Sequence, residues 1–102
     1  MSIGEIRDSN SFALRMDCEV YIIQNANGHY YVGVTGDMTR RLEEHNRGQN
    51  RSTRGKGPWT LMYTENFPSS LEAKRREHEI KKKKSKRYIQ WLIKENLRGS
   101  LV

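Results

Sequence analysis

Residues 20–34 read VYIIQNANGHYYVGV, and this stretch decides the fold. Val20–Ile23 and Tyr30–Val34 are runs of β-branched and aromatic residues, a composition that favours buried strands. The segment between them contains Asn27-Gly28, a dipeptide typical of the tight turn in a β-hairpin. The sequence therefore predicts two antiparallel strands joined by a short loop.

The length of this loop decides whether Tyr21 and Tyr31 share one face of the sheet. A two-residue Asn-Gly loop pairs Gln24 with Tyr31 and places the two tyrosines on opposite faces. A three-residue loop, closed by a glycine in the left-handed conformation, pairs Ile23 with Tyr31 and places them on one face. The sequence is compatible with both registers. Gly33, inside the second strand, predicts the close approach of another backbone or of a ligand.

Beyond the hairpin, the chain predicts a helix and then a third strand. Asp37 can cap a helix whose apolar stripe includes Met38 and Leu42. Gly48 stands where the left-handed residue after a helix belongs. Trp59–Thr64 repeats the β-branched and aromatic composition of the first two strands, so the expected sheet has a third member.

The C-terminal part of the chain predicts one or two further helices. Ser69 or Ser70 can cap a helix that runs through a basic stretch. Helical spacing from Tyr88 predicts either a last helix or a continuation of that one, ending near Leu97. Together the elements indicate an α+β fold, a small three-stranded antiparallel sheet flanked by helices. We expect an N-terminal arm at residues 1–17, one domain at residues 18–97, and a C-terminal tail at residues 98–102.

Composition restricts the class of protein. A chain of 102 residues is expected to form one domain with a small core. No apolar run approaches the ~18 residues that span a bilayer, and the N-terminus lacks the pattern of a secretory signal. The single cysteine, Cys18, excludes an intrachain disulfide. We therefore expect a cytoplasmic protein with no membrane contact and no small-molecule cofactor.

The positive charge is concentrated in the second part of the chain. Residues 1–36 carry a net charge of −2 and residues 37–102 a net charge of +9. Nine of the basic residues fall between Lys74 and Arg87. A basic segment on an otherwise balanced domain indicates a polyanionic partner such as nucleic acid, although a solvated helix face explains the same charges.

Glu77 is the carboxylate with the strongest claim to a chemical role. Ala73, Glu77 and Ile80 lie on one stripe of the predicted helix, so Glu77 is expected to point inward or to lie at the edge of the core. An inward carboxylate needs a cation or hydrogen-bond donors. A divalent metal would meet this need, and so would an ion pair with a neighbouring arginine.

Two other pairs of residues allow a chemical and a structural interpretation. Arg41 and His45 are four residues apart on one face of the first helix. Arginine can hold a phosphate with two hydrogen bonds, and histidine can contact or protonate one, but an ordinary surface pair has the same spacing. Tyr21 and Tyr31 form either a two-phenol face or part of the core.

Taken together, these residues resemble the GIY-YIG nuclease superfamily. Val20-Tyr21-Ile22 and Tyr31-Val32-Gly33 are similar to its paired signatures, and residues 57–67 and 72–81 resemble its third strand and second helix. The resemblance covers residues 18–97 and is strongest to the short, stand-alone bacterial endonucleases. Between the signatures and the third strand, the pattern continues with Thr35, Asp37, Arg41, Leu42, His45 and Asn46.

The resemblance implies a metal-dependent DNA endonuclease, a phosphodiester hydrolase. Glu77 would be the sole protein ligand of Mg²⁺ or Mn²⁺, ions that use few carboxylates and keep several waters. Tyr31 would help to activate the attacking water, and Tyr21 would position that water or share the role. Arg41 would stabilise the charged phosphate, with assistance from His45. A non-catalytic nucleic-acid-binding module with the same fold is the alternative.

Two positions depart from the family pattern, and one group of basic residues extends it. Glu19 occupies the glycine position of the first signature, and Val34 stands where some members carry a lysine.

Because no added recognition module is evident, we expect structure-selective or weakly sequence-selective cleavage in DNA repair or recombination, with a partner protein for targeting. The residues expected to grip the DNA backbone are Arg47, Arg51, Arg54, Lys56, Lys81, Lys82, Lys83 and Lys84.

Overall fold

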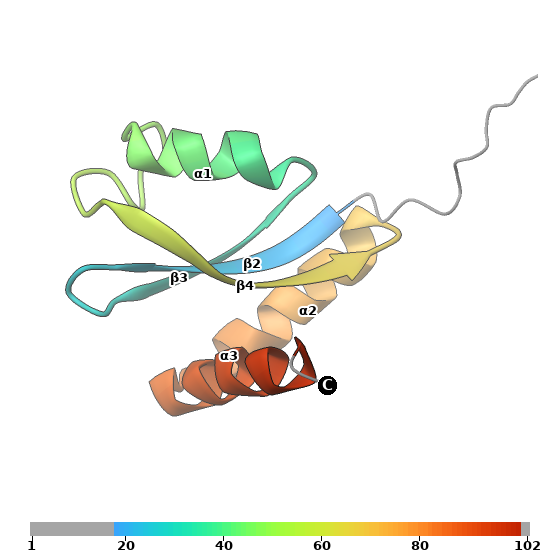
Figure 1. Cartoon of the computed structure of the whole chain (residues 1–102). Helices are drawn as coiled ribbons and strands as arrows, with labels where there is room; N and C mark the ends of the chain where they lie inside the picture. The colour runs from blue at the N-terminus through green and yellow to red at the C-terminus, as the bar shows by residue number, and fades with distance from the viewer. Residues whose placement is uncertain (1–17, 101–102) are drawn as a thin grey trace, which may run out of the picture.

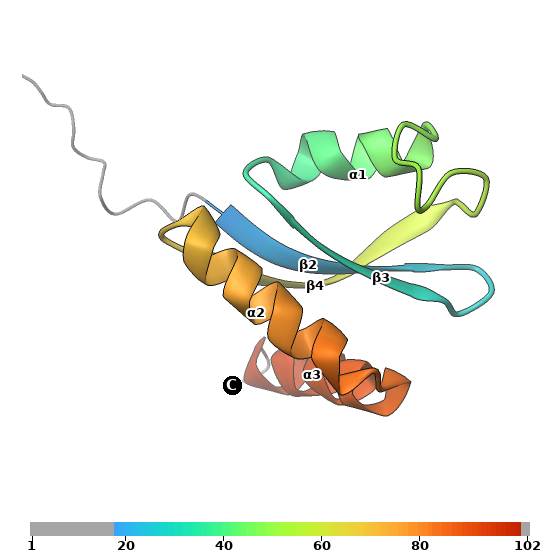
Figure 2. The same ribbon diagram turned by 180° about the vertical axis from the view of Figure 1, so that it is seen from behind.

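The computed structural model describes residues 18–100, which form three layers (Figure 1). In chain order the elements are β2 (Cys18–Asn25), β3 (Tyr30–Thr35), α1 (Met38–Asn46), β4 (Trp59–Phe67), α2 (Ser70–Lys83) and α3 (Lys86–Ser100). The middle layer is a three-stranded antiparallel sheet with the strand order β3-β2-β4. Helix α1 covers one face of this sheet, while α2 and α3 cover the other, as the reverse view also shows (Figure 2). This arrangement confirms the predicted α+β fold.

The β2–β3 hairpin has the longer of the two loops compatible with the sequence. Ile23 pairs with Tyr31, and Tyr21 pairs with Gly33. The turn is closed by Gly28, whose φ of 84° lies in the left-handed region that glycine tolerates best. In this register Tyr21 and Tyr31 share the face of the sheet that α1 covers.

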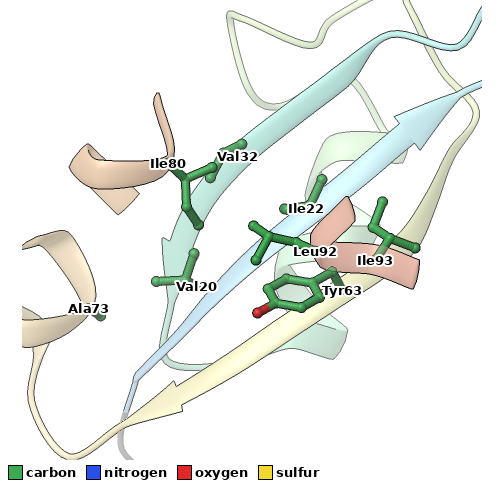
Figure 3. Close-up of a cluster of buried hydrophobic side chains, with 8 residues drawn as sticks. All are labelled: Val20, Ile22, Val32, Tyr63, Ala73, Ile80, Leu92 and Ile93. Carbon is green, nitrogen blue, oxygen red and sulfur yellow. The ribbon is translucent and has the colours of Figure 1, made fainter. Parts of the chain in front are cut away.

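Strand β2 is buried on both faces, which explains its continuous apolar composition. Its alternate residues pack in opposite directions, with Val20 and Ile22 toward α2 and α3, and Tyr21 and Ile23 toward α1. The smaller cluster, beneath α1, is completed by Trp59. The larger cluster consists of Val20, Ile22, Val32, Tyr63, Ala73, Ile80, Leu92 and Ile93 (Figure 3).

Side-chain caps determine where the helices begin. The carboxylate of Asp37 accepts a hydrogen bond from a backbone N–H in the first turn of α1, as predicted. Ser69, and not Ser70, caps α2 in the same way. Lys84 follows α2 in a left-handed conformation with φ of 48°, and this residue separates α2 from α3. The last helix is therefore a separate element rather than a continuation.

The predicted division of the chain stays a prediction. The expected N-terminal arm, residues 1–17, and residues 101–102 of the expected tail lie outside the described residues. Helix α3 continues to Ser100, past the helix end expected near Leu97. Within residues 18–100, no helix has both the length and the apolar character needed to cross a bilayer.

Candidate active site

Four of the five side chains predicted to be catalytic meet on the α1 face of the sheet. Tyr21 comes from β2, Tyr31 from β3, and Arg41 and His45 from α1. The ring centroid of His45 lies 5.6 Å from that of Tyr21 and 5.0 Å from that of Tyr31. The two tyrosine rings are 6.3 Å apart. The strand register and the helix cap described above bring these residues together.

Gly33 makes room for Tyr21 across the two strands. A Cβ atom at this position would lie 2.5 Å from the Tyr21 hydroxyl oxygen and 2.6 Å from its Cζ, distances that real Cβ atoms do not reach. The sequence predicted a close approach at this glycine by a backbone or a ligand. The structure corrects that expectation, because the group that approaches is the ring of the cross-strand tyrosine.

Tyr21 and His45 form a buried hydrogen-bonded pair. The Tyr21 hydroxyl lies 2.6 Å from His45 Nε2, and the Nε of Arg41 donates to the same hydroxyl at 3.4 Å. The exposed fraction is 0% for Tyr21 and 1% for His45. His45 is therefore not the ordinary surface residue that its helical spacing allowed.

Burial changes the ionisation of both members of this pair. It raises the pKa of Tyr21 to about 12, and the hydrogen bond from Arg41 opposes this shift only in part. Burial also lowers the pKa of His45, and the positive charge of Arg41 lowers it further. At pH 7, Tyr21 is consequently a neutral phenol and His45 a neutral imidazole.

The guanidinium of Arg41 is fixed at two of its three nitrogens. Nε binds the Tyr21 hydroxyl, and Nη1 binds the carboxylate of Glu44 at 2.8 Å. Glu44 is held in turn by Arg40, at 2.7 Å. In the described part of the chain, Nη2 makes no hydrogen bond, and the side chain is 28% exposed. Arg41 can therefore offer a donor to an external anion without giving up its own supports.

Tyr31 is the accessible phenol of the cluster. It is half-buried, and its side chain lines two neighbouring clefts, of about 520 and 430 Å³. Lys81 contributes to the larger cleft, and its ammonium lies 5.9 Å from the centroid of the Tyr31 ring. Lys56 and Thr53 contribute to the smaller cleft. A substrate can therefore reach Tyr31 but not the fully buried Tyr21.

Glu77, the fifth predicted catalytic residue, lies on α2, on the face of the sheet opposite α1. Its side chain is 23% exposed, so it lies at the edge of the core, as predicted. The ion-pair partner of Glu77 is Lys81, at 2.9 Å, and not the arginine that the sequence suggested as an alternative. Lys81, which pairs with Glu77, lies 5.9 Å from the Tyr31 ring centroid, so Glu77 lies near the tyrosine cluster. Its negative charge adds slightly to the upward shift of the Tyr21 pKa.

The residues present fit a metal site in which the protein supplies one carboxylate and water and phosphate supply the other ligands. No group of three or more His, Cys, Asp or Glu side chains able to hold a metal occurs within residues 18–100. A single, partly exposed carboxylate suits Mg²⁺ or Mn²⁺, since these ions take their remaining oxygens from water and phosphate. Lys81, which now neutralises Glu77, would have to give up this contact to a bound cation.

Comparison with known proteins identifies the family. The model of the GIY-YIG catalytic domain matches residues 18–90. The chain belongs to the GIY-YIG family. The matched segment contains both tyrosines, Arg41, His45 and Glu77. GIY-YIG membership indicates a nuclease-type activity on nucleic acid, and GIY-YIG nucleases generally use divalent metals.

Relatives of this GIY-YIG domain occur in archaea and bacteria. The UPF0213 protein of Halobacterium salinarum is 51% identical over 63 residues, which cover 61% of this chain and 82% of the relative. The UPF0213 protein of Halalkalibacterium halodurans is 43% identical over 67 residues, which cover 65% of this chain and 71% of the relative. The solution NMR structure of the UPF0213 protein from Bacillus halodurans is 40% identical and covers 76% of this chain and 82% of that chain, with a TM-score of 0.48.

The basic residues expected to hold DNA are all exposed, but they do not form one group around the GIY-YIG site. Arg47, Arg51, Arg54 and Lys56 lie on or beside the loop between α1 and β4, and Lys81 and Lys84 line the larger Tyr31 cleft. Lys82 and Lys83 instead line a pocket with Tyr88, where the Lys83 ammonium lies 5.1 Å from the ring centroid.

Sequence reasoning missed two residues of the site. Thr53 lies in the loop between α1 and β4, residues 47–58, which we call the basic loop. It is 1% exposed, and its hydroxyl lies 2.7 Å from His45 Nδ1. No periodicity marks it, because its neighbours Ser52 and Arg54 are polar and exposed. Glu44, which holds Arg41, could have been found from its spacing of three residues on the same helix.

Proposed function

We propose that this GIY-YIG domain is an endonuclease that hydrolyses phosphodiester bonds in DNA with the help of Mg²⁺ or Mn²⁺. The observation that supports the proposal is that an accessible phenol, a supported guanidinium and a carboxylate, from three different elements, lie around the Tyr21–His45 pair. Tyr31 borders two clefts, Arg41 donates to the Tyr21 hydroxyl, and Glu77 is paired with Lys81, whose ammonium lies 5.9 Å from the Tyr31 ring centroid. Packing alone does not require these three polar groups to lie so close together.

Arg41 would bind the scissile phosphate through its unoccupied Nη2. Its other donors already bind Tyr21 and Glu44, so the guanidinium is held in place before the substrate arrives. A preorganised cation stabilises the charge that develops on the phosphate without further reorganisation. In this role the buried Tyr21 positions Arg41, and His45 positions Tyr21.

Tyr31 would orient and activate the attacking water. Of the two tyrosines in the cluster, Tyr31 is the one that borders both clefts, whereas Tyr21 is fully buried and its pKa is raised to about 12. The Lys81 ammonium lies 5.9 Å from the Tyr31 ring centroid and borders the larger of the two clefts, so it adds positive charge where the water and the phosphate would bind.

Glu77 would hold the divalent cation together with water and phosphate oxygens. Such a cation neutralises charge on the phosphate and on the leaving oxygen. The basic residues of the loop and of α2 would hold the DNA backbone without reading its sequence. We therefore extend the proposal to structure-selective or weakly sequence-selective cleavage in DNA repair or recombination, in the cytoplasm, with a partner protein for targeting.

A non-catalytic nucleic-acid-binding module is the second candidate, and the Glu77–Lys81 ion pair favours it. The Lys81 ammonium lies 2.9 Å from the Glu77 carboxylate and neutralises its charge without any metal. Incubation with supercoiled plasmid in Mg²⁺, Mn²⁺ or EDTA separates the two candidates. Nicking that stops in EDTA supports the endonuclease. DNA binding that is unaffected by EDTA, with no nicking of supercoiled, branched or single-stranded DNA, would support the binding module instead.

A further inference from the structure

We propose that Thr53 is a positioning residue of the active site, which fixes the tautomer of His45 and thereby orients the Tyr21 phenol. The inference rests on the proposed function, which gives Tyr21 the task of holding Arg41. It adds a residue from the basic loop to a cluster otherwise built from the sheet and α1. Thr53 itself would touch neither substrate nor metal in this role.

A continuous buried path joins the loop to the central strand. The Thr53 hydroxyl lies 2.7 Å from His45 Nδ1, and His45 Nε2 lies 2.6 Å from the Tyr21 hydroxyl. All three side chains are at most 1% exposed. These polar atoms are therefore shielded from bulk water and depend mainly on their protein partners.

All the donors and acceptors along this path are paired if each proton is donated in the direction from Arg41 toward Thr53. Arg41 Nε donates to the Tyr21 oxygen, which leaves the Tyr21 proton free to be donated to His45 Nε2. His45 Nδ1 then carries the ring proton and donates it to Thr53. The Thr53 hydroxyl in turn can donate to either oxygen of Asn50, the backbone carbonyl or Oδ1, each at 3.5 Å.

The opposite tautomer leaves a buried proton without a partner. If His45 carried its proton on Nε2, it would donate to the Tyr21 oxygen, which already accepts from Arg41. The Tyr21 O–H would then have no acceptor among the contacts of residues 18–100. Because Tyr21 is 0% exposed, this arrangement is disfavoured. In the other tautomer every proton on the path has an acceptor, because the Thr53 hydroxyl accepts from Nδ1 while its own proton is directed to Asn50.

Thr53 is itself held in place by the backbone around it. Its N–H donates to the Asn50 carbonyl at 3.2 Å, and its own carbonyl accepts from the backbone N–H of Lys56 at 3.2 Å. The indole N–H of Trp59, at the start of β4, donates to the same carbonyl at 3.3 Å. The loop therefore fixes the backbone of Thr53, which places the hydroxyl beside His45 Nδ1.

The test compares Thr53→Val, which removes the hydroxyl but keeps the shape, with Thr53→Ser, which keeps the hydroxyl. The full-length chain is used throughout. Proton–nitrogen NMR spectra of His45 report which ring nitrogen carries the proton, without reference to activity. Plasmid nicking gives kcat and KM for the same three proteins, and circular dichroism with thermal unfolding shows that each one folds.

We expect wild type and Thr53→Ser to hold His45 with its proton on Nδ1, and Thr53→Val to lose this single tautomer. Nicking by Thr53→Val should show kcat lowered roughly tenfold to a hundredfold, the loss that small misplacements of catalytic groups produce. Its KM should stay within about twofold, since Thr53 does not contact DNA in this account. Thr53→Ser should retain most of the wild-type kcat.

A proton on Nε2 of His45 in the wild-type protein would overturn the inference, even if Thr53→Val does not fold. It would equally be overturned if Thr53→Val folded and kept both the tautomer and kcat, or if Thr53→Ser lost as much kcat as Thr53→Val. If wild type shows the predicted tautomer but nicks no DNA, the proposed function fails while the hydrogen-bond assignment stands.

Discussion

The hydroxyl of Tyr21 lies 2.6 Å from Nε2 of His45, inside a cluster that solvent does not reach. This contact joins the central strand to the helix above it, and Arg41 binds the same hydroxyl from one helical turn away. The pair therefore connects the packing of the domain to the placement of the guanidinium proposed to bind phosphate. Several measurable consequences follow from the burial of the pair and from its neighbours.

Replacing the two tyrosines by phenylalanine should have different consequences. Tyr21→Phe removes the donor to His45 and the acceptor for Arg41, so it should lower the free energy of unfolding by about 1–3 kcal/mol as well as kcat. Tyr31→Phe acts at a half-buried phenol, so it should lower kcat with little loss of stability. Urea unfolding and plasmid nicking of both variants check this. Equal losses of stability would contradict the distinction between a positioning and a reacting phenol.

Gly33→Ala should destabilise the domain through its contact with Tyr21. The added Cβ would lie 2.5 Å from the tyrosine hydroxyl, and the buried ring cannot move without disturbing its partners. We expect a loss of about 1–3 kcal/mol in the free energy of unfolding, the usual cost of overpacking. The matched control repeats the change in a Tyr21→Ala background, where the loss should largely disappear. An equal loss in both backgrounds would show that the tyrosine ring is not the cause.

The stability of the domain should decrease in mildly acidic solution because of His45. Burial lowers the pKa of His45 in the folded state below the ordinary value of ~6.5 that it has in the unfolded chain. As the pH falls through that ordinary value toward the folded-state pKa, the unfolded chain takes up a proton first, so the stability present at higher pH is lost. Urea unfolding between about pH 7.5 and about pH 5, a range that brackets the ordinary histidine pKa, measures this effect.

Two histidine variants locate the source of this pH dependence. His45→Gln should remove most of it, whereas His78→Gln, at an exposed position on α2, should leave it unchanged. If stability is constant over the same range in the wild-type domain, or if the His78 variant abolishes the dependence, His45 is not the group that titrates.

The basic loop should contribute to DNA binding through charge alone. Arg54→Ala should weaken binding to every DNA sequence by a similar factor and reduce the slope of log affinity against log salt by about 1. Lys94→Ala, on α3 and outside the predicted contact set, is the control for a general change in net charge. Fluorescence anisotropy at several salt concentrations gives both slopes. A sequence-dependent loss would instead indicate that Arg54 reads bases.

The sequence was sufficient to predict the sheet, the Asp37 cap of the first helix and the family resemblance, because each depends on local chemistry. Asp37 and the Asn-Gly turn are signals contained within a few residues. The hairpin register stayed open, since loops of two and three residues fit the same letters and only packing of Tyr21 over Gly33 distinguishes them. The burial of His45 depends on Thr53, which lies eight residues further along the chain in a loop without periodicity. The pairing of Glu77 with Lys81 could have been predicted from their spacing of four residues, because no arginine stands three or four residues from Glu77 on this helix.

The most direct test of the proposed metal-dependent nuclease is plasmid nicking by wild type, Glu77→Gln and Glu79→Gln in Mg²⁺ or Mn²⁺. Glu79 lies on the same helix, but it is 65% exposed and pairs with Arg76, away from the tyrosine cluster. We predict that wild type and Glu79→Gln nick the plasmid, that EDTA stops both, and that folded Glu77→Gln does not nick. Nicking by Glu77→Gln at the wild-type rate would contradict the role of this carboxylate, and the absence of nicking by wild type on every DNA form would contradict the proposed function itself.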